Sequence, residues 1–128
     1  MSDYQSKKEA FRTRTKAYAS MVVKSYCALP KNRPECQVLG KQLLRSGTSV
    51  AANYRECSRA RSDAEFVSKC DQCTQEADES MLWIELLLED CHIDSSDLKW
   101  LLNESNELIA IFTTMSRNVK RRLHSAHE

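Results

Sequence analysis

The chain of 128 residues is long enough for one domain, and it contains only two glycines and two prolines. This composition, with 29% charged residues, favours long helices and argues against a turn-rich β-sandwich. Nineteen basic and eighteen acidic residues leave a formal net charge of +1, so no overall charge directs the protein to nucleic acid or to a membrane.

Apolar residues recur every three or four positions along the first predicted helix, which covers about residues 5–29. Pro30 ends this helix because proline lacks the amide proton that a further turn needs. The second predicted helix covers about residues 35–60, and Pro34 suits its first position. Both glycines of the chain fall inside this second helix, so neither belongs to a phosphate-binding loop.

The third predicted helix covers about residues 63–91 and begins with the spacing of a capping box. In that motif the Ser62 hydroxyl accepts from the Glu65 amide, and the Glu65 carboxylate accepts from the Ser62 amide. The fourth predicted helix covers about residues 95–123. Connections of two to six residues are too short to cross a bundle, so consecutive helices must be antiparallel. The sequence therefore predicts an all-α protein, a single antiparallel up-down-up-down four-helix bundle over residues 1–128.

This topology brings the start of the first helix, the second connection and the end of the fourth helix to one end. Residues 1–17, 48–72 and 113–128 carry thirteen basic and seven acidic residues, a net charge of +6, and the remainder carries −5. Basic residues at a helix C-terminus can simply stabilise the helix and solvate the surface. The alternative is a phosphate-binding rim. No aromatic residue is interleaved in the C-terminal basic run, which argues against base stacking there. The candidate nucleic-acid-binding residues are Lys7, Lys8, Arg12, Arg14, Arg59, Arg61, Arg117, Lys120, Arg121 and Arg122.

The first twenty residues hold five basic side chains and no apolar core, so we expect no signal peptide. The longest apolar stretch, residues 81–88, is far shorter than the roughly 20 residues of a membrane span. We therefore expect a cytoplasmic protein with no membrane partner.

Six cysteines in such a chain are expected to be reduced thiols that fill the core. The pair Cys70 and Cys73 lies in mid-helix without a second pair to complete a zinc site. Glu89 and His92 form one Glu-x-x-His motif, whereas a di-iron bundle needs two. No histidine lies in the middle of a helix, where a catalytic triad could be assembled. We expect no catalytic residue, metal, cofactor or small-molecule substrate.

A polar stripe follows the apolar face of the second helix, and small residues beside it permit close approach of another helix. It is either an ordinary solvated face or a hydrogen-bonded seam within the bundle or between subunits. The seam and interface candidates are Gln42, Arg45, Ser49, Asn53, Glu56, Glu76, Glu79 and Trp83. Trp83 and Trp100 also lie off the main apolar stripes, which indicates extra surface that self-association would cover.

Several segments of the sequence carry a family resemblance. They are residues 42–56 (QLLRSGTSVAANYRE), 59–62 (RARS), 65–66 (EF) and 76–79 (EADE), Trp83, and 85–87 (ELL). In these segments the chain resembles the four-helix-bundle proteins encoded within 23S ribosomal RNA intervening sequences, over about residues 11–112. The cysteine-rich third helix departs from the usual aliphatic residues.

The resemblance implies an up-down bundle that assembles into a ring-like homopentamer. It also implies kinship with the accessory variability proteins of diversity-generating retroelements, which engage a reverse transcriptase and nucleic acid. It transfers no catalytic residue.

We therefore expect a non-catalytic homo-oligomer that binds RNA or a ribonucleoprotein partner through its basic rim. The alternative is a protein–protein interaction scaffold with no nucleic-acid role.

Overall fold

A computed structural model describes residues 2–126 and contains four helices. They are α1 (Asp3–Cys27), α2 (Pro34–Ser58), α3 (Asp63–Glu89) and α4 (Ser96–Ala126), and no strand occurs among the described residues. The predicted all-α fold is confirmed.

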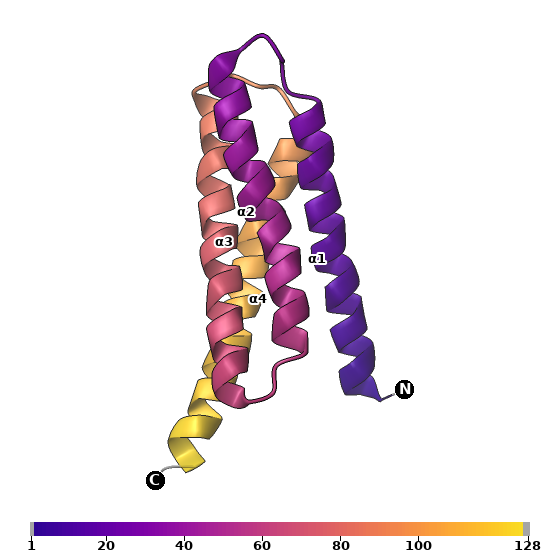
Figure 1. The fold of residues 1–128 in the computed structure, drawn as a ribbon, viewed down its shortest axis with the longest axis vertical. Coiled ribbons are helices and arrows are strands. Elements are labelled where there is room, and N and C mark those ends of the chain that lie inside the picture. The colour runs from indigo at the N-terminus through magenta and orange to yellow at the C-terminus, as the bar shows by residue number, and fades with distance from the viewer. Residues whose placement is uncertain (1, 127–128) are drawn as a thin grey trace.

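The four helices form an up-down-up-down bundle (Figure 1). The connections 28–33 and 90–95 lie at one end, and the connection 59–62 lies at the other end together with the start of α1 and the end of α4. α2 packs on α1 and α3, α4 packs closely on α3, and α4 meets α1 less extensively. The chain therefore brings together the three segments whose basic residues were predicted to meet.

The predicted apolar stripes form the core between the helices. Side chains with no exposed surface come from all four: Tyr18, Val22, Leu43, Val50, Cys73, Ile84, Leu101, Leu108 and Phe112. Burial of these side chains stabilises the fold because apolar surface leaves water.

Buried hydroxyl groups in the core pair with one another across neighbouring helices. The Tyr18 hydroxyl lies 2.6 Å from the Ser105 hydroxyl, and the Ser46 hydroxyl lies 2.7 Å from the Ser80 hydroxyl. These two pairs link α1 to α4 and α2 to α3. They satisfy polar groups that would otherwise be costly to bury.

Gly47 allows α1 and α2 to approach closely. A Cβ atom at Gly47 would lie 2.6 Å from Cγ2 of Val22 on α1, much closer than a normal contact. The predicted close approach beside the polar stripe is therefore made by α1, within the same chain.

The ends of α1 and α2 differ from the prediction by about two residues. α1 ends at Cys27 because the Leu29 amide donates to the Tyr26 carbonyl, a tighter turn that precedes Pro30. α2 begins at Pro34, as the favourable first position of proline suggested, and ends at Ser58.

α3 ends at Glu89, before the predicted residue 91, because His92 adopts a left-handed conformation (φ 56°) that stops the helix. α4 begins at Ser96, with the Ser95 hydroxyl accepting from the Leu98 amide, and continues to Ala126. It therefore runs three residues past its predicted end.

The predicted capping box at the start of α3 is half correct. The Ser62 hydroxyl accepts from the Glu65 amide at 3.1 Å, as predicted. The Glu65 carboxylate accepts from the Arg61 amide at 3.1 Å instead of the Ser62 amide. Ser62 is extended, as N-cap residues usually are, and the Glu65 side chain reaches one residue past its amide.

Candidate nucleic-acid interface

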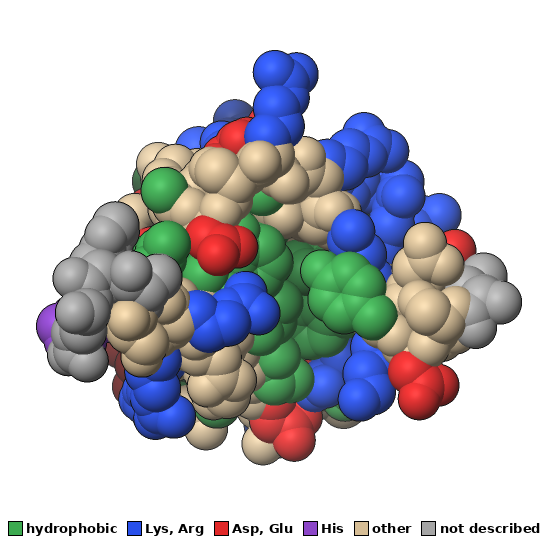
Figure 2. Space-filling model, turned by 90° about the horizontal axis from the view of Figure 1, so that it is seen from below, with side chains coloured by type: hydrophobic (Ala, Val, Ile, Leu, Met, Phe, Trp, Pro, Cys, Tyr) green, Lys and Arg blue, Asp and Glu red, His purple; other side chains and the backbone are tan. Residues whose placement is uncertain are grey.

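The ten cationic candidates come from α1, from the α2–α3 connection and its flanks, and from α4. Figure 2 looks onto this end and shows Lys and Arg side chains around a hollow with hydrophobic side chains at its bottom. Lys8, Arg12 and Arg14 are partly buried, and the other candidates are exposed. The fold therefore brings the three segments that carry the candidates to the same end of the bundle.

Most of these cations have no anionic partner. Within the described part of the chain, seven of the ten form no ion pair: Lys7, Lys8, Arg12, Arg59, Arg61, Arg117 and Arg121. We call these seven residues the basic rim. A cation that forms no ion pair within the protein is free to neutralise a phosphate of a ligand.

Two α4 cations are held by exposed acidic residues of α3. Lys120 lies 3.4 Å from Asp71, and Arg122 lies 3.7 Å from Asp63. Exposed pairs of this kind contribute only about 0–1 kcal/mol, so they anchor α4 to α3 weakly.

Arg14 has a different role from the basic rim. Its Nε and Nη2 atoms donate to the two carboxylate oxygens of Glu104 on α4, at 2.8 and 2.7 Å, and Nη2 also lies 3.2 Å from Glu107. Glu104 is only 7% exposed, and the hydrogen bonds from Arg14 lower the pKa of its carboxyl group. Arg14 is thus committed to joining α1 and α4.

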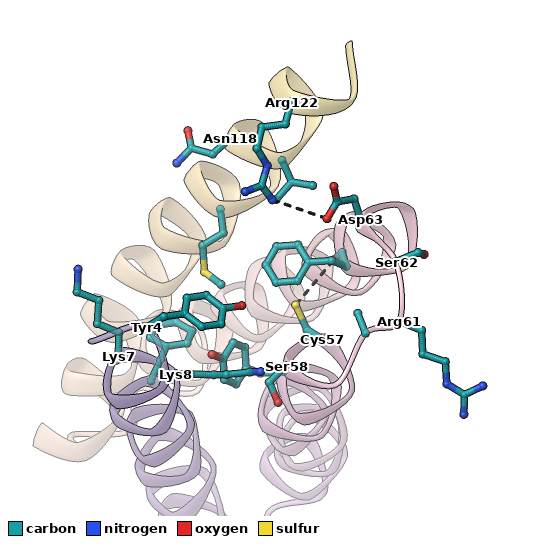
Figure 3. A pocket seen from close by; sticks show the side chains of 16 residues that line it. Tyr4, Lys7, Lys8, Cys57, Ser58, Arg61, Ser62, Asp63, Asn118 and Arg122 are labelled. Atoms are coloured by element: carbon teal, nitrogen blue, oxygen red, sulfur yellow. Dashed lines mark hydrogen bonds and ion pairs between the residues drawn. The ribbon is translucent and has the colours of Figure 1, made fainter. Parts of the chain in front are cut away.

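A cavity of about 670 Å³ opens in the middle of this end (Figures 2 and 3). Its apolar lining includes Phe11 of α1, Tyr54 of α2, Phe66 of α3, and Met115 and Val119 of α4. We call this space the end cavity. Each helix contributes at least one of these side chains, so no single stretch of sequence announces it.

Aromatic rings support one wall of the end cavity. The ring of Phe11 lies edge-on to those of Tyr54 and Phe112, with centroids 4.8 and 5.4 Å away. Tyr4 lies at the opening, 69% exposed, with the Lys8 ammonium 5.5 Å from its ring centroid. The C-terminal basic run lacks aromatic residues, yet the fold places aromatic residues of α1 and α2 beside it.

Tyr54 brings a polar group to the lining. Its side chain is only 3% exposed, and its hydroxyl forms no hydrogen bond with any described residue. Burial raises the pKa of Tyr54 to about 12, so the phenol stays protonated at neutral pH and remains a hydrogen-bond donor.

The predicted polar seam lies along the outside of the α2–α3 interface. Arg45 of α2 reaches two residues of α3, Glu79 at 2.6 Å and Glu76 at 3.3 Å. Farther along, Lys69 of α3 lies 2.6 Å from Glu56 of α2. These ion pairs join α2 to α3 of the same chain, as the alternative of a polar seam within the bundle predicted.

The remaining seam candidates contribute less to this link. The Ser49 hydroxyl donates to the Arg45 carbonyl of its own helix at 2.7 Å. Gln42 and Asn53 form no hydrogen bond with the described residues. Trp83 packs partly buried against the core, and its buried indole nitrogen has no acceptor among them.

Five of the six cysteines are buried, and all six are free thiols. The sulfur atoms of Cys57 and Cys70 lie 3.2 Å apart between α2 and α3. Burial raises the pKa of the Cys73 thiol, and the contact with Cys57 together with burial raises that of Cys70. The thiols of Cys70 and Cys73 are therefore protonated at neutral pH and pack as small apolar groups.

No group of three or more His, Cys, Asp or Glu side chains in residues 2–126 is arranged to hold a metal ion. No helix in the same range combines the length and hydropathy needed to cross a bilayer.

The chain is similar to proteins of one family. The model of the family described as 23S rRNA-intervening sequence protein matches residues 7–114. A crystal structure of a protein of unknown function, from the S23 ribosomal protein family of Bacteroides thetaiotaomicron, is 32% identical in sequence and superposes with a TM-score of 0.77. That similarity covers 87% of this chain and 98% of the other. No curated protein matches the sequence.

Proposed function

The chain belongs to the 23S rRNA-intervening sequence protein family, and from this premise we propose that it is a non-catalytic, homo-oligomeric protein that binds RNA. The RNA would be bound alone or within a ribonucleoprotein, in the cytoplasm, through the basic end of the bundle. The observation that supports this most is the basic rim, seven cations from distant parts of the chain that meet at one end and form no ion pair with a described residue.

The physical basis of binding would be neutralisation of phosphates. Each cation that contacts a phosphate releases condensed counterions, so affinity falls as salt rises, with a slope of roughly 0.7 per contact for a single strand. Arg14 would not contribute, because Glu104 and Glu107 already neutralise it.

Exposed aromatic surface at the same end favours unpaired RNA over a duplex. Tyr4 is largely exposed beside Lys8, and a flat ring next to a cation can stack on an unpaired base. We therefore expect loops or single-stranded ends to bind more tightly than a continuous duplex.

Self-association would cover apolar side chains that one bundle leaves in water. Val38, Leu82 and Trp100 are 61%, 48% and 43% exposed and lie on three different helices. Covering such groups favours assembly, and the family resemblance implies a pentamer. Light scattering at micromolar concentration is expected to give a mass several times the 14.7 kDa of one chain. A monomer would contradict this part of the proposal.

RNA binding can be tested by fluorescence anisotropy with a hairpin that has a single-stranded loop, at 50 and 200 mM salt. The double variant Arg117→Glu with Arg121→Glu removes two cations of the basic rim that make no ion pair. We expect it to weaken binding at least about tenfold, the loss of two charged contacts.

The matched control carries the same charge change elsewhere, at Lys31 in the α1–α2 connection and Lys41 of α2, both exposed. Lys31→Glu with Lys41→Glu is expected to bind RNA nearly as well as the native chain. Absent or salt-insensitive binding by the native chain would refute the RNA proposal and leave the protein–protein scaffold as the function.

A further inference from the structure

The end cavity has the size and character of a small-molecule site. Its volume of about 670 Å³ lies within the range of roughly 300–1,000 Å³ that such sites occupy. Apolar side chains of all four helices line it, and buried apolar surface is what an uncharged ligand body would contact.

The opening of the end cavity is strongly cationic. Lys7, Lys8, Arg61 and Arg122 belong to its lining, and the single acidic lining residue, Asp63, is already paired with Arg122. Figure 3 shows Lys8 extending across the opening from α1 toward Ser58, and Arg122 reaching from α4 toward Asp63. The Lys7 and Arg61 side chains point away from the cavity in the same view, so Lys8 and Arg122 lie nearest to it.

We propose that the end cavity binds a small amphipathic anion, with its apolar body between Phe11, Phe66 and Val119 and its head group at Lys8 and Arg122. A carboxylate or sulfonate on a medium-length alkyl chain or a fused aromatic ring has this chemistry. The protonated Tyr54 hydroxyl, which hydrogen-bonds to none of the residues 2–126, is available to donate a hydrogen bond to the ligand.

The charge of the opening and the polarity of the floor together select this class of ligand. A cation would be repelled by the lysines and the arginine. A nucleobase would place its polar edge against an apolar floor where few groups could pair with it, at a cost of about 1–3 kcal/mol per unpaired group. An amphipathic anion suits both parts of the site, because its charge faces the cationic opening and its apolar body contacts the apolar floor.

The test is isothermal titration calorimetry of the intact chain with decanoate and, separately, 2-naphthoate. Decyltrimethylammonium, decan-1-ol and adenosine monophosphate serve as comparison probes. We expect one saturable site per chain for at least one of the two acids, with the ammonium compound binding at least about tenfold more weakly because its charge is reversed. The two acids distinguish an alkyl ligand from an aromatic one.

Two variants locate the site. Lys7→Glu with Lys8→Glu is expected to lower the affinity for the acid at least about tenfold and to leave the affinity for decan-1-ol nearly unchanged. Lys31→Glu with Lys41→Glu is expected to change neither affinity. Ala60→Trp places a large ring in the lining and is expected to abolish binding of the acid. Circular dichroism and thermal melting confirm that each variant is folded.

Ala60→Trp also separates this inference from RNA binding, because it keeps every cation of the basic rim. We expect it to bind the RNA hairpin normally. Equal binding of the ammonium compound, tighter binding of adenosine monophosphate than of either acid, or an acid affinity that neither variant changes would overturn the proposal.

Discussion

The two ends of the bundle differ in how completely they are closed. At the end that carries connections 28–33 and 90–95, Arg33 donates to the Cys91 carbonyl at 2.9 Å and Gln37 donates to the Pro30 carbonyl at 3.0 Å. At the other end, no side chain of α1 before Thr15 is fully buried, and the end cavity lies between the helices. The apolar stripes are regular at both ends, so periodicity alone does not close a bundle.

The difference arises from how the chain connects its helices. Two short connections hold all four helices at the closed end, whereas one connection joins only α2 and α3 at the open end (Figure 1). There no connection joins α1 or α4 to another helix, and the contact between these two depends on side chains such as Arg14 and Glu104. The surface with most of the unpaired charge is thus also the least constrained.

Loss of the Arg14 side chain is expected to lower the stability of the open end more than any other substitution considered below. Arg14→Ala leaves the mostly buried Glu104 carboxylate without its partner, which we expect to lower the free energy of unfolding by about 2 kcal/mol. Urea denaturation measures this change, and hydrogen exchange should accelerate in α1 near the open end only. Glu107→Gln, at an exposed position, is the control and should cost under about 0.5 kcal/mol. Equal losses for both variants would contradict the role of Arg14.

The second prediction concerns pH at the same contact. Arg14 lowers the pKa of Glu104 in the folded state, so the stabilisation is complete above the unfolded carboxyl pKa of about 4.3 and is lost as pH falls through the lower folded value. Glu104→Gln should therefore be about 1.5 kcal/mol less stable than the native chain at pH 7. The difference should shrink toward pH 3 in urea titrations. A difference that is constant with pH would show that the charge is not involved.

The smallest expected effects come from the two glycines of α2, where α1 packs closely against α2. Gly47→Ala brings a methyl group against the branched Val22 side chain, and we expect a net cost of about 1 kcal/mol after the gain in helix propensity. Gly40→Ala at the closed end meets the far ends of the Leu29 and Tyr26 side chains, which can turn aside. Its cost should be smaller. Val22→Ala should cost less in the Gly47→Ala chain than in the native chain, because the added methyl group fills part of the space that it vacates.

Prediction from the sequence succeeded where the signal is local. Residues spaced three or four apart from Phe66 to Leu87 make up the buried face of α3, because a helix places such positions on one side wherever it lies. The Ser62 hydroxyl cap was likewise predictable, since it involves residues three apart.

The sequence did not predict contacts between side chains that lie on different helices. Arg14 was assigned to the rim with the other cations, because the sequence does not show that Glu104, ninety residues away, lies opposite it. The aromatic residues beside the C-terminal basic run were missed for the same reason. Tyr4, Phe11 and Tyr54 lie far from that run in the chain and reach it only through packing.

Four helices, their buried faces, their alternating directions and the gathering of basic residues at one end followed from the sequence by itself. Helical periodicity and short connections determine all four through local geometry. Only the tertiary structure decided which cations are paired, that Arg14 joins α1 to α4, and that a cavity with aromatic walls opens inside the basic rim. These depend on the spacing and relative height of the helices, which are set by the packing of the whole bundle.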